Sequence, residues 1–350
     1  MFFLNKVLPL LPFDLKWKDI DTSCTKFIHR LYSLLNNNYV EDFYSFLRFN
    51  YVHEFLKFAI SSPNWASFLN LGLKFNRTEK INGFITSNFR KIIIRNQLIF
   101  CSEINFLCLQ KKLRKKLFVQ VLIKEITRRI NCFGKTKAVY TTGLPFLRPF
   151  LKTNYFYFSL KTQKQGIFNG GKFTNCSYKN QEMLLDWKKF NPKKKKIPNY
   201  RTHLKNMKKN FQKKKIYKHF ELIDFFYWIR FVKGFKYAFI NRNGVLNNKK
   251  SIISFYALAC KTVKSKRPCY FYDAYFYYGT QMIERGLFIT NTLVICKSIG
   301  FDLFYILDGH YNENFLLNSK FKNGYNRVSL YMLGLKIKII EPLENALIFF

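Results

Sequence analysis

The stretch from Glu103 to Ile130 constrains the fold most, because two secondary-structure periods follow each other directly. Glu103–Leu109 is a short apolar run, which is typical of a buried strand. Basic residues follow, and apolar residues then recur at the spacing of one helix face. These apolar residues are Val119, Leu122, Ile123, Ile126 and Ile130. A strand that leads at once into an amphipathic helix predicts a mixed α/β protein.

The turn between this strand and this helix is a candidate anion site. Its basic residues would lie near the free amides at the helix start, where the helix dipole also attracts negative charge. The turn Arg114–Val119 lacks the glycines of a nucleotide-triphosphate loop, so it suits the pyrophosphate of coenzyme A better, as in acetyltransferase-like folds. A plain amphipathic helix with a basic start explains the same residues, and the pattern alone leaves both interpretations open.

The charge of the chain has two competing explanations. Its 60 basic and 20 acidic residues give a formal net charge of +40, which is the electrostatic footprint of a polyanion partner such as ribosomal RNA. The alternative is compositional drift, because Lys, Phe, Asn and Ile, whose codons are rich in A and T, are all abundant. Lysine outnumbers arginine, whereas bidentate phosphate contacts favour arginine. The charge by itself therefore predicts no nucleic-acid function.

A basic segment separates the two halves of the chain. Residues 188–218 contain 14 Lys or Arg and no acid, which is typical of a solvated or mobile connector. An RNA or membrane-surface patch is the alternative. The regions before and after this segment both have the pattern of a mixed α/β protein. In the C-terminal region we expect a helix at Asn291–Ile299 and a strand after Gly300. We therefore divide the chain into residues 1–175, a basic connector at 176–220, and residues 221–350.

The cysteines and the apolar runs set limits on compartment and ligands. The eight cysteines include no CxxC pair and no Cys/His cluster at zinc spacing, so we expect reduced thiols, no metal and a cytoplasmic protein. The longest uncharged run, Phe58–Leu73, is 16 residues and contains Pro63. A membrane helix needs about 18 or more apolar residues, so we expect none. The start, Met1–Leu4, has no basic region, so we expect no secretory signal.

Several motifs occur in the order in which one known family has them. The run Glu103–Arg114 (EINFLCLQKKLR) resembles the signature of the eukaryotic glycylpeptide N-myristoyltransferases, with Gln110 in place of the family's histidine. Further matches are Leu11–Pro12, Leu34–Asn36, Asn38–Asp42, Arg48–Tyr51, Val121–Arg129, Ala138–Gly143, Ser254–Tyr256, Asn312–Phe321 and Ala346–Phe350. The resemblance spans nearly the whole chain except about 165–220. It implies an α/β fold of two acetyltransferase-like (GNAT-like) halves related by pseudo-two-fold symmetry, with mixed sheets flanked by helices. The N-terminal half would bind acyl-CoA, and the C-terminal half the peptide.

The resemblance also implies the chemistry. Acyl transfer from a thioester must stabilise negative charge on the carbonyl oxygen, and the family uses two main-chain amides, which fall here at Phe106 and Leu107. A bulged strand could aim both amides at one point. The general base would be the terminal carboxylate of Phe350, and Asn105 and Thr141 would orient the glycine amine. The amine is itself the nucleophile, so no Ser or Cys nucleophile is needed.

The same resemblance assigns residues to the two substrates. Acyl-CoA would lie against Phe2, Phe3, Phe106, Leu107, Cys108, Leu109, Arg114, Lys115, Lys116, Leu117, Phe118 and Val119. The peptide would lie against Tyr39, Val40, Glu41, Asp42, Phe49, Tyr51, Tyr157, Ser254 and Tyr325. Leu117 replaces an arginine of the family, Tyr157 a histidine and Tyr325 an acid. The changes on the peptide side affect peptide preference more than chemistry.

We therefore expect an acyltransferase that moves myristate from myristoyl-CoA to the N-terminal glycine of peptides or nascent proteins, with no cofactor or metal. We also expect a cytoplasmic monomer, whose basic connector could associate with ribosomes. The alternative is a basic RNA-binding or ribosome-associated protein that keeps the fold without turnover. A steep salt dependence of binding would favour that alternative.

Overall fold

The computed structural model describes residues 11–12, 14–39, 47–142, 148–161, 187–189, 200–241, 251–262, 270–280, 285–311 and 313–347. The chain divides into two compact units. The first unit contains residues 1–152, 328–340 and 349–350, and the second contains residues 153–327 and 341–348. Each unit is described by itself.

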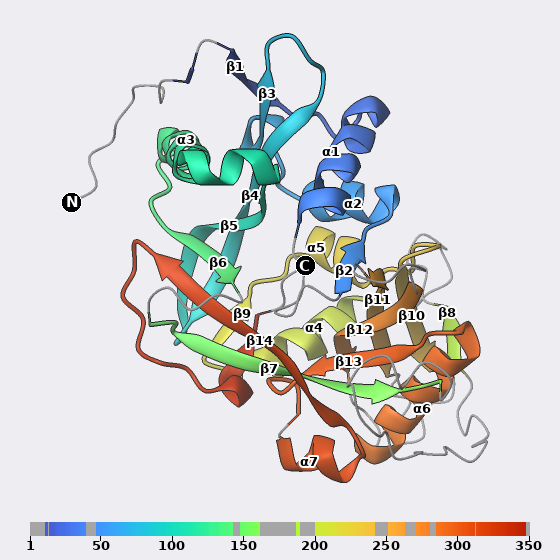
Figure 1. Cartoon of the computed structure of the whole chain (residues 1–350). Coiled ribbons are helices and arrows are strands. Elements are labelled where there is room, and N and C mark those ends of the chain that lie inside the picture. The colour runs from blue at the N-terminus through green and yellow to red at the C-terminus, as the bar shows by residue number, and fades with distance from the viewer. Residues whose placement is uncertain are drawn as a thin grey trace. The chain divides into compact units, whose positions relative to one another are not determined.

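The first unit is a mixed sheet with helices packed on it (Figure 1). Its strands follow the order β1-β3-β4-β5-β6, and Ser329–Leu333 of β14 pair with β6. All neighbours are antiparallel except β5 and β6, which are parallel. The elements are β1 (Leu15–Asp19), α1 (Thr25–Asn38), β2 (Leu47–Asn50), α2 (His53–Ile60), η1 (Ser67–Leu69), β3 (Asn70–Phe75), β4 (Ile81–Ile94), β5 (Gln97–Leu109), η2 (Lys111–Lys116), α3 (Phe118–Cys132), β6 (Ala138–Thr142) and β14 (Lys322–Leu333).

The predicted strand and helix around residue 110 are β5 and α3. Leu122, Ile126 and Ile130 are buried on α3 and join a core cluster with residues of β3 and β4. Fully burying one such side chain stabilises the fold by about 1.5–3 kcal/mol. The apolar period of this segment therefore packs α3 on the sheet and confirms the predicted helix. The prediction is wrong for Ile123, which is 43% exposed.

The second unit is built on a longer, mostly antiparallel sheet. Its strand order is β14-β7-β13-β12-β11-β10-β8, with β12 and β13 parallel, and β9 pairs with β15. The elements are β7 (Leu151–Ser159), β8 (Trp187–Lys189), α4 (Tyr200–Phe211), β9 (Ile216–Lys218), α5 (Leu222–Ile229), β10 (Lys236–Asn241), β11 (Ile252–Thr262), β12 (Tyr270–Thr280), α6 (Arg285–Ile299), β13 (Leu303–Leu307), α7 (Glu313–Asn318), η4 (Pro342–Glu344) and β15 (Asn345–Ala346).

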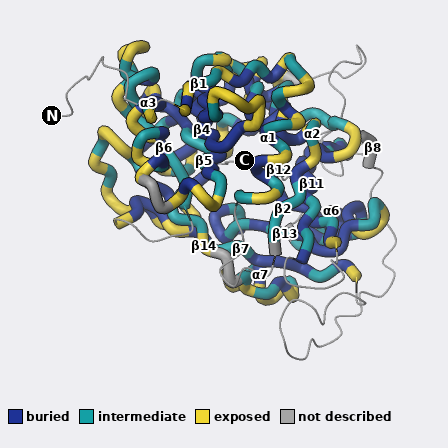
Figure 2. The backbone as a smooth tube through the Cα atoms, turned by 45° about the horizontal axis from the view of Figure 1, so that its top comes forward, coloured by how far each residue is buried: buried dark blue, intermediate teal, exposed yellow. Residues whose placement is uncertain are grey.

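One face of this second sheet packs against α6. Phe288, Leu293 and Cys296 of α6 lie in a buried cluster with residues of β7, β11, β12 and β13. Figure 2 shows buried backbone running along these strands. The predicted helix at Asn291–Ile299 and the strand after Gly300 are thus confirmed. The helix begins earlier, at Arg285, and the strand begins at Leu303.

The basic connector needs a correction. We expected a solvated or mobile segment, but its described part contains β8, α4 and β9. Leu204, Met207 and Phe211 are buried on one face of α4. Three apolar residues spaced i, i+3 and i+7 form a helix face, and the surrounding lysines obscured this pattern in the sequence.

The two units also differ from the sequence-based division at the C-terminal end. Residues 328–340 return to the first unit because Ser329–Leu333 pair with Ala138–Thr142 of β6. A long-range strand pairing of this kind leaves no local mark in the sequence. None of the described helices is long and apolar enough to cross a membrane, and the six cysteines in the described ranges are free thiols.

Candidate functional site

The strand β5 contains a bulge at Phe106 and Leu107. Phe84 pairs with Cys108 and Thr86 pairs with Asn105, so one residue of β4 faces two residues of β5. Phe106 has φ +53°, a conformation that costs a residue with a side chain about 1–3 kcal/mol. Backbone strain of this size clusters at functional sites. The bulge takes the amides of Phe106 and Leu107 out of the regular ladder with β4.

Aromatic rings surround the bulge. The Phe106 ring centroid lies 5.8 Å from that of Tyr39 and 6.0 Å from that of Tyr51, which itself contacts Phe49 at 5.7 Å. The Phe106 amide donates a hydrogen bond to the Tyr39 hydroxyl. Burial raises the pKa of Tyr39 above its ordinary value, and the amide contact only partly offsets this rise. Tyr39 is therefore a neutral phenol beside a backbone donor.

An ion pair holds the residue that precedes the bulge. Asn105 Nδ2 donates to Glu103 Oε1 at 2.9 Å, and the Glu103 carboxylate accepts from Arg90 Nε at 2.6 Å. Arg90 also donates to Ser62 Oγ at 2.7 Å. Glu103 and Arg90 are 6% exposed each, so this buried network fixes the orientation of the Asn105 amide. The sequence analysis assigned no site role to Arg90 or Glu103. Glu103 could have been found, because it begins the family signature and is a carboxylate in a strand that was predicted to be buried.

Thr141 comes next to Asn105 through strand pairing. β5 and β6 run parallel, and Ile104 pairs with Tyr140. Asn105 and Thr141 are the next residues on these two strands, so the two side-chain positions expected to orient the amine are neighbours beside the bulge. Thr141 itself pairs with Leu330 of β14.

The thiol after the bulge is not a nucleophile. Cys108 is 3% exposed, and burial raises the pKa of its thiol to about 12 although Arg114 lowers it slightly. Only the thiolate attacks a thioester, and almost none is present at neutral pH. Leu109 follows on β5 and is equally buried. The site therefore fits direct attack by the substrate amine.

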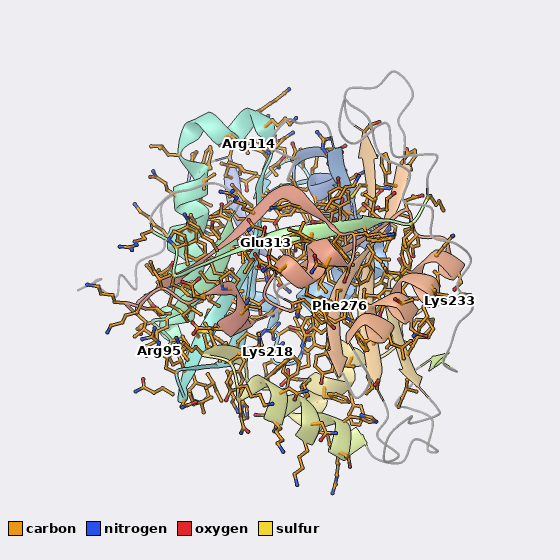
Figure 3. All side chains as sticks on the ribbon, turned by 90° about the horizontal axis from the view of Figure 1, so that it is seen from below. Arg95, Arg114, Lys218, Lys233, Phe276 and Glu313 are labelled. Carbon is orange, nitrogen blue, oxygen red and sulfur yellow. The ribbon has the colours of Figure 1, made fainter. Side chains whose placement is uncertain are left out.

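The expected anion site is a short 3₁₀ helix followed by α3. Leu117, with φ +60°, separates η2 from α3, and no side chain caps the helix start at Phe118. Arg114 lies beside this turn (Figure 3), where its Nε donates to Leu109 O at 3.1 Å and its guanidinium also contacts Asn38 O. Its charge is thus anchored near uncapped amides. The backbone of Lys115 and Lys116 belongs to η2; their side chains lie outside the described residues.

The residues of the second unit that we expect to contact the peptide lie on or next to a row of four tyrosines. Tyr157, Tyr305, Tyr275 and Tyr256 occupy paired positions on β7, β13, β12 and β11. The Tyr275 ring stacks at 4.7 Å on Tyr305 and at 5.4 Å on Tyr256. Alternation along the strands places this row opposite the face that packs on α6. Ser254, fully buried, lies two residues before Tyr256.

This row is electrically neutral. Burial is the largest cause that raises the pKa of Tyr256, Tyr275 and Tyr305 well above the ordinary value. Of the four tyrosines, the sequence analysis predicted only Tyr157 as a site residue, because the row comes from strands that are far apart in the chain. No spacing rule within one strand could have signalled it.

The other predicted site residues cannot be placed. Phe2, Phe3, Val40, Glu41, Asp42 and Phe350 lie outside the described residues, as does the side chain of Tyr325 on β14. Before Phe350, Ala346 and Leu347 are buried at 6% and 5% exposure. The apolar C-terminal segment is therefore packed up to its last described residue.

The fold places the chain in a known structural class. It resembles a GCN5-related N-acetyltransferase from Anabaena variabilis, with a TM-score of 0.51 at 11% identity over 90% of this chain and 72% of that chain. The chain thus has an acetyltransferase-like α/β fold. Models of the N-terminal and C-terminal domains of myristoyl-CoA:protein N-myristoyltransferase match residues 4–152 and 178–346. The chain belongs to the N-myristoyltransferase family.

Individual relatives agree with this assignment. Glycylpeptide N-tetradecanoyltransferase 2 of Danio rerio is 31% identical over 97% of this chain and 70% of that protein. Glycylpeptide N-tetradecanoyltransferase 1 of Arabidopsis thaliana is 28% identical over 97% of this chain and 80% of its own length. A crystal structure of Saccharomyces cerevisiae N-myristoyltransferase with bound myristoyl-CoA has a TM-score of 0.82 at 25% identity, covering 97% and 83% of the two chains.

Proposed function

We propose that this protein transfers myristate from myristoyl-CoA to the N-terminal glycine amine of proteins. The observation that carries the proposal is the bulge at Phe106–Leu107, which lies inside the family signature and takes two successive amides out of the β4–β5 ladder. A backbone donor aimed at a developing oxyanion is worth roughly 3 kcal/mol of transition-state stabilisation. Because the donors are main-chain groups, the differing side chains of this divergent sequence do not weaken that function.

In the reaction, the glycine nitrogen attacks the thioester carbonyl carbon and the amides of Phe106 and Leu107 stabilise the oxyanion. The C–N bond forms, the C–S bond breaks, and coenzyme A leaves as a thiolate that takes up a proton. In this scheme Asn105, held by Glu103, accepts or donates a hydrogen bond that orients the amine, together with Thr141. The hydrogen bond from the Phe106 amide to the Tyr39 hydroxyl must break before this amide can donate to the thioester oxygen.

The general base in this proposal is the carboxylate of Phe350. An α-amine with a pKa near 8 is partly protonated at neutral pH and needs an acceptor for its proton. Support comes from the resemblance, from the burial of Ala346 and Leu347, and from the thiol of Cys108 being unsuited to covalent catalysis. The carboxylate would act through its position, because it belongs to the main chain.

The two substrates would use different surfaces. Acyl-CoA would contact Cys108 and Leu109, and its pyrophosphate would bind Arg114 and the first amides of α3. Lys115 and Lys116 would add charge, since Leu117 cannot. As the resemblance implies, the peptide would contact Tyr39, Phe49, Tyr51, Tyr157 and Ser254. A neutral tyrosine row would bind apolar or hydroxyl-bearing residues in preference to a bare charge.

Three further properties are proposals with indirect support. The protein would act in the cytoplasm, in line with the six free cysteines among its described residues, and as a monomer. Its basic connector would bring it to ribosomes through phosphate contacts. No cofactor besides the co-substrate myristoyl-CoA is needed for the chemistry described.

The direct test mixes the protein with myristoyl-CoA and a glycine-starting peptide and measures the peptide mass. We expect one myristoyl group on the glycine peptide and none on the same peptide with an acetylated N-terminus. Tight myristoyl-CoA binding without transfer to any member of a glycine-peptide panel would contradict the enzyme assignment.

The base is tested by blocking the terminal carboxylate. Amidation of Phe350, or a short C-terminal extension, should lower turnover by about 10²-fold or more, the scale of a lost general base. Phe350→Leu should change turnover little, since the chemistry belongs to the main-chain group. Myristoyl-CoA affinity should survive both changes. An amidated protein with the unmodified turnover rate would rule out this base.

A further inference from the structure

The hairpin formed by β4 and β5 in the first unit presents large apolar side chains to solvent. Strand pairing places Ile93 opposite Leu98 and Lys91 opposite Phe100, and residues that pair across strands point to the same face of a sheet. Leu98 and Phe100 are 48% and 46% exposed. Single exposed apolar residues are normal on a protein surface, whereas a contiguous group of them marks an interaction site.

Two further exposed apolar residues lie on this face. In the next row of the sheet Phe89 pairs with Ser102. Ala138 of β6 pairs with both Ser102 and Leu333, so Leu333 points to the same face, and it is 43% exposed. Phe133, directly after α3, is 52% exposed, and its ring centroid lies 6.0 Å from that of Phe89. A patch of four exposed apolar side chains therefore extends from the hairpin to β14.

Basic side chains are interleaved with this patch, which we call the hairpin patch and which consists of Leu98, Phe100, Phe133 and Leu333. The ammonium nitrogens of Lys135 and Lys91 lie 4.9 Å and 5.7 Å from the centroid of the Phe100 ring, within the range of a cation–π contact. Arg95, at the turn of the hairpin, is exposed (Figure 3).

The segments that build the hairpin patch carry no negative charge. Residues 89–102, 126–138 and 328–340 contain no Asp or Glu. Glu103, the next acid along β5, is buried and paired with Arg90. The patch is thus apolar and basic at once, which is the combination that complements a surface with negative head groups over an apolar interior.

We propose that the hairpin patch docks the protein on an anionic membrane surface. Leu98, Phe100, Phe133 and Leu333 would enter the boundary between head groups and acyl chains, while the basic residues bind lipid phosphates. RNA fits this surface less well, because it offers phosphates and stacking bases but no apolar layer for Leu98 and Leu333. The inference goes beyond the proposed function and does not depend on it, since lipid binding needs neither myristoyl-CoA nor a peptide.

The test is sedimentation of the full chain with phosphatidylcholine vesicles that contain either no phosphatidylserine or about 30% of it. We expect binding to the anionic vesicles alone. Leu98→Gln combined with Phe100→Gln should weaken that binding roughly 10-fold, because less apolar area enters the interface. Lys91→Gln combined with Lys135→Gln should weaken it roughly 10- to 30-fold through lost contacts with the lipid phosphates.

A matched control separates the patch from the high net charge of the chain, which attracts any anionic vesicle. Ile223→Gln combined with Lys26→Gln removes one exposed apolar and one exposed basic residue outside the patch. This variant should lose no more than a few-fold in binding. Leu333→Gln is a second patch variant, on a different strand from the hairpin. All variants should keep the thermal midpoint of the unmodified protein, because the replaced side chains are exposed or at the surface.

Vesicle binding that does not depend on phosphatidylserine would overturn the proposal. So would patch variants that bind the anionic vesicles as well as the control variant does. If the Leu98 and Phe100 changes abolish binding to single-stranded RNA but leave vesicle binding intact, the patch is a nucleic-acid site and the proposal is wrong. A protein that binds the vesicles through the patch but transfers no myristate would refute the proposed function alone, so the two failures are distinguishable.

Discussion

At Phe106 a single backbone angle sets up the proposed chemistry. A φ of +53° is unfavourable for phenylalanine, yet the ring contacts of Tyr39 and Tyr51 hold the residue in place. In the proposed mechanism the bulge would direct the two oxyanion donors, and the aromatic rings would limit the access of water to them. The same logic applies at Asn105, whose amide is oriented by a buried carboxylate.

Tyr325 is expected to alter peptide choice. It replaces a carboxylate of the family signature, so an acceptor for a basic peptide residue is lost. Tyr325→Asp should raise the preference for peptides with a basic residue facing this position by about 1–2 kcal/mol, if the new pair is partly desolvated. The measurement is kcat/KM across a peptide panel. An identical ranking for both proteins would mean that this loop is aligned wrongly.

Asp308 should make stability depend on pH. Burial raises the pKa of this carboxyl to about 6, although the Asn154 amides and the Gly309 amide lower it and Glu313 adds repulsion. A raised pKa in the folded state means that the stabilisation is complete below the unfolded value of about 4 and is lost as the pH rises through about 6.

Asp308→Asn should therefore raise the free energy of unfolding at pH 8 by roughly 1–3 kcal/mol and change it little at pH 4. Urea titrations at both pH values measure the difference. The matched control is Asp14→Asn, at an exposed position. Equal gains at both pH values would show that the effect does not come from this ionisation.

At the scale of elements, α3 links the turn that is proposed to bind acyl-CoA to the sheet. Its apolar face packs on β3 and β4, and the buried Glu125 binds Arg128 at 2.8 Å and Arg129 at 2.7 Å. Arg129 in turn binds Asp19 of β1 at 2.6 Å. This network anchors the C-terminal half of the helix to β1.

Glu125→Ala should lower the free energy of unfolding by about 3 kcal/mol, since it removes the buried carboxylate that binds Arg128 and leaves Arg129 with Asp19 as its carboxylate partner. Lys124→Ala, at the exposed neighbouring position, should change it by no more than about 0.5 kcal/mol. Burial raises the pKa of Glu125, but the two arginines outweigh it and the pKa lies below its ordinary value. The stabilisation by Glu125 should therefore be present above about pH 4.5 and disappear at lower pH.

At the scale of the whole molecule, the net charge of +40 is not explained by the acyl-transfer site. The basic connector divides into parts with different roles. Lys214 and Lys215 contact Leu343 and Glu344 near the C-terminus, whereas Lys193–Lys196 lie outside the described residues and match no family motif. Function should therefore depend on where a lysine lies, and not on the total charge.

Replacing Lys193–Lys196 with glutamine should leave acyl transfer to a short uncharged peptide within a few-fold of the original rate. Binding to ribosomes, if these lysines contribute, should weaken and show a shallower salt dependence. Steady-state kinetics and sedimentation with ribosomes at several salt concentrations measure the two effects. A large loss of turnover on the uncharged peptide would place this segment in the active site.

The sequence by itself determined the family and the elements around residue 110, whereas tertiary structure decided how the elements meet. The strand β5, the helix α3 and the motif Glu103–Arg114 depend on residues within a few positions of one another, so their periods could be recognised directly. The tyrosine row, the Arg90–Glu103–Asn105 network and the contacts of Lys214 and Lys215 join residues from separate strands or distant segments. Which strands pair is set by the packing of whole faces, and no local pattern of residues encodes it.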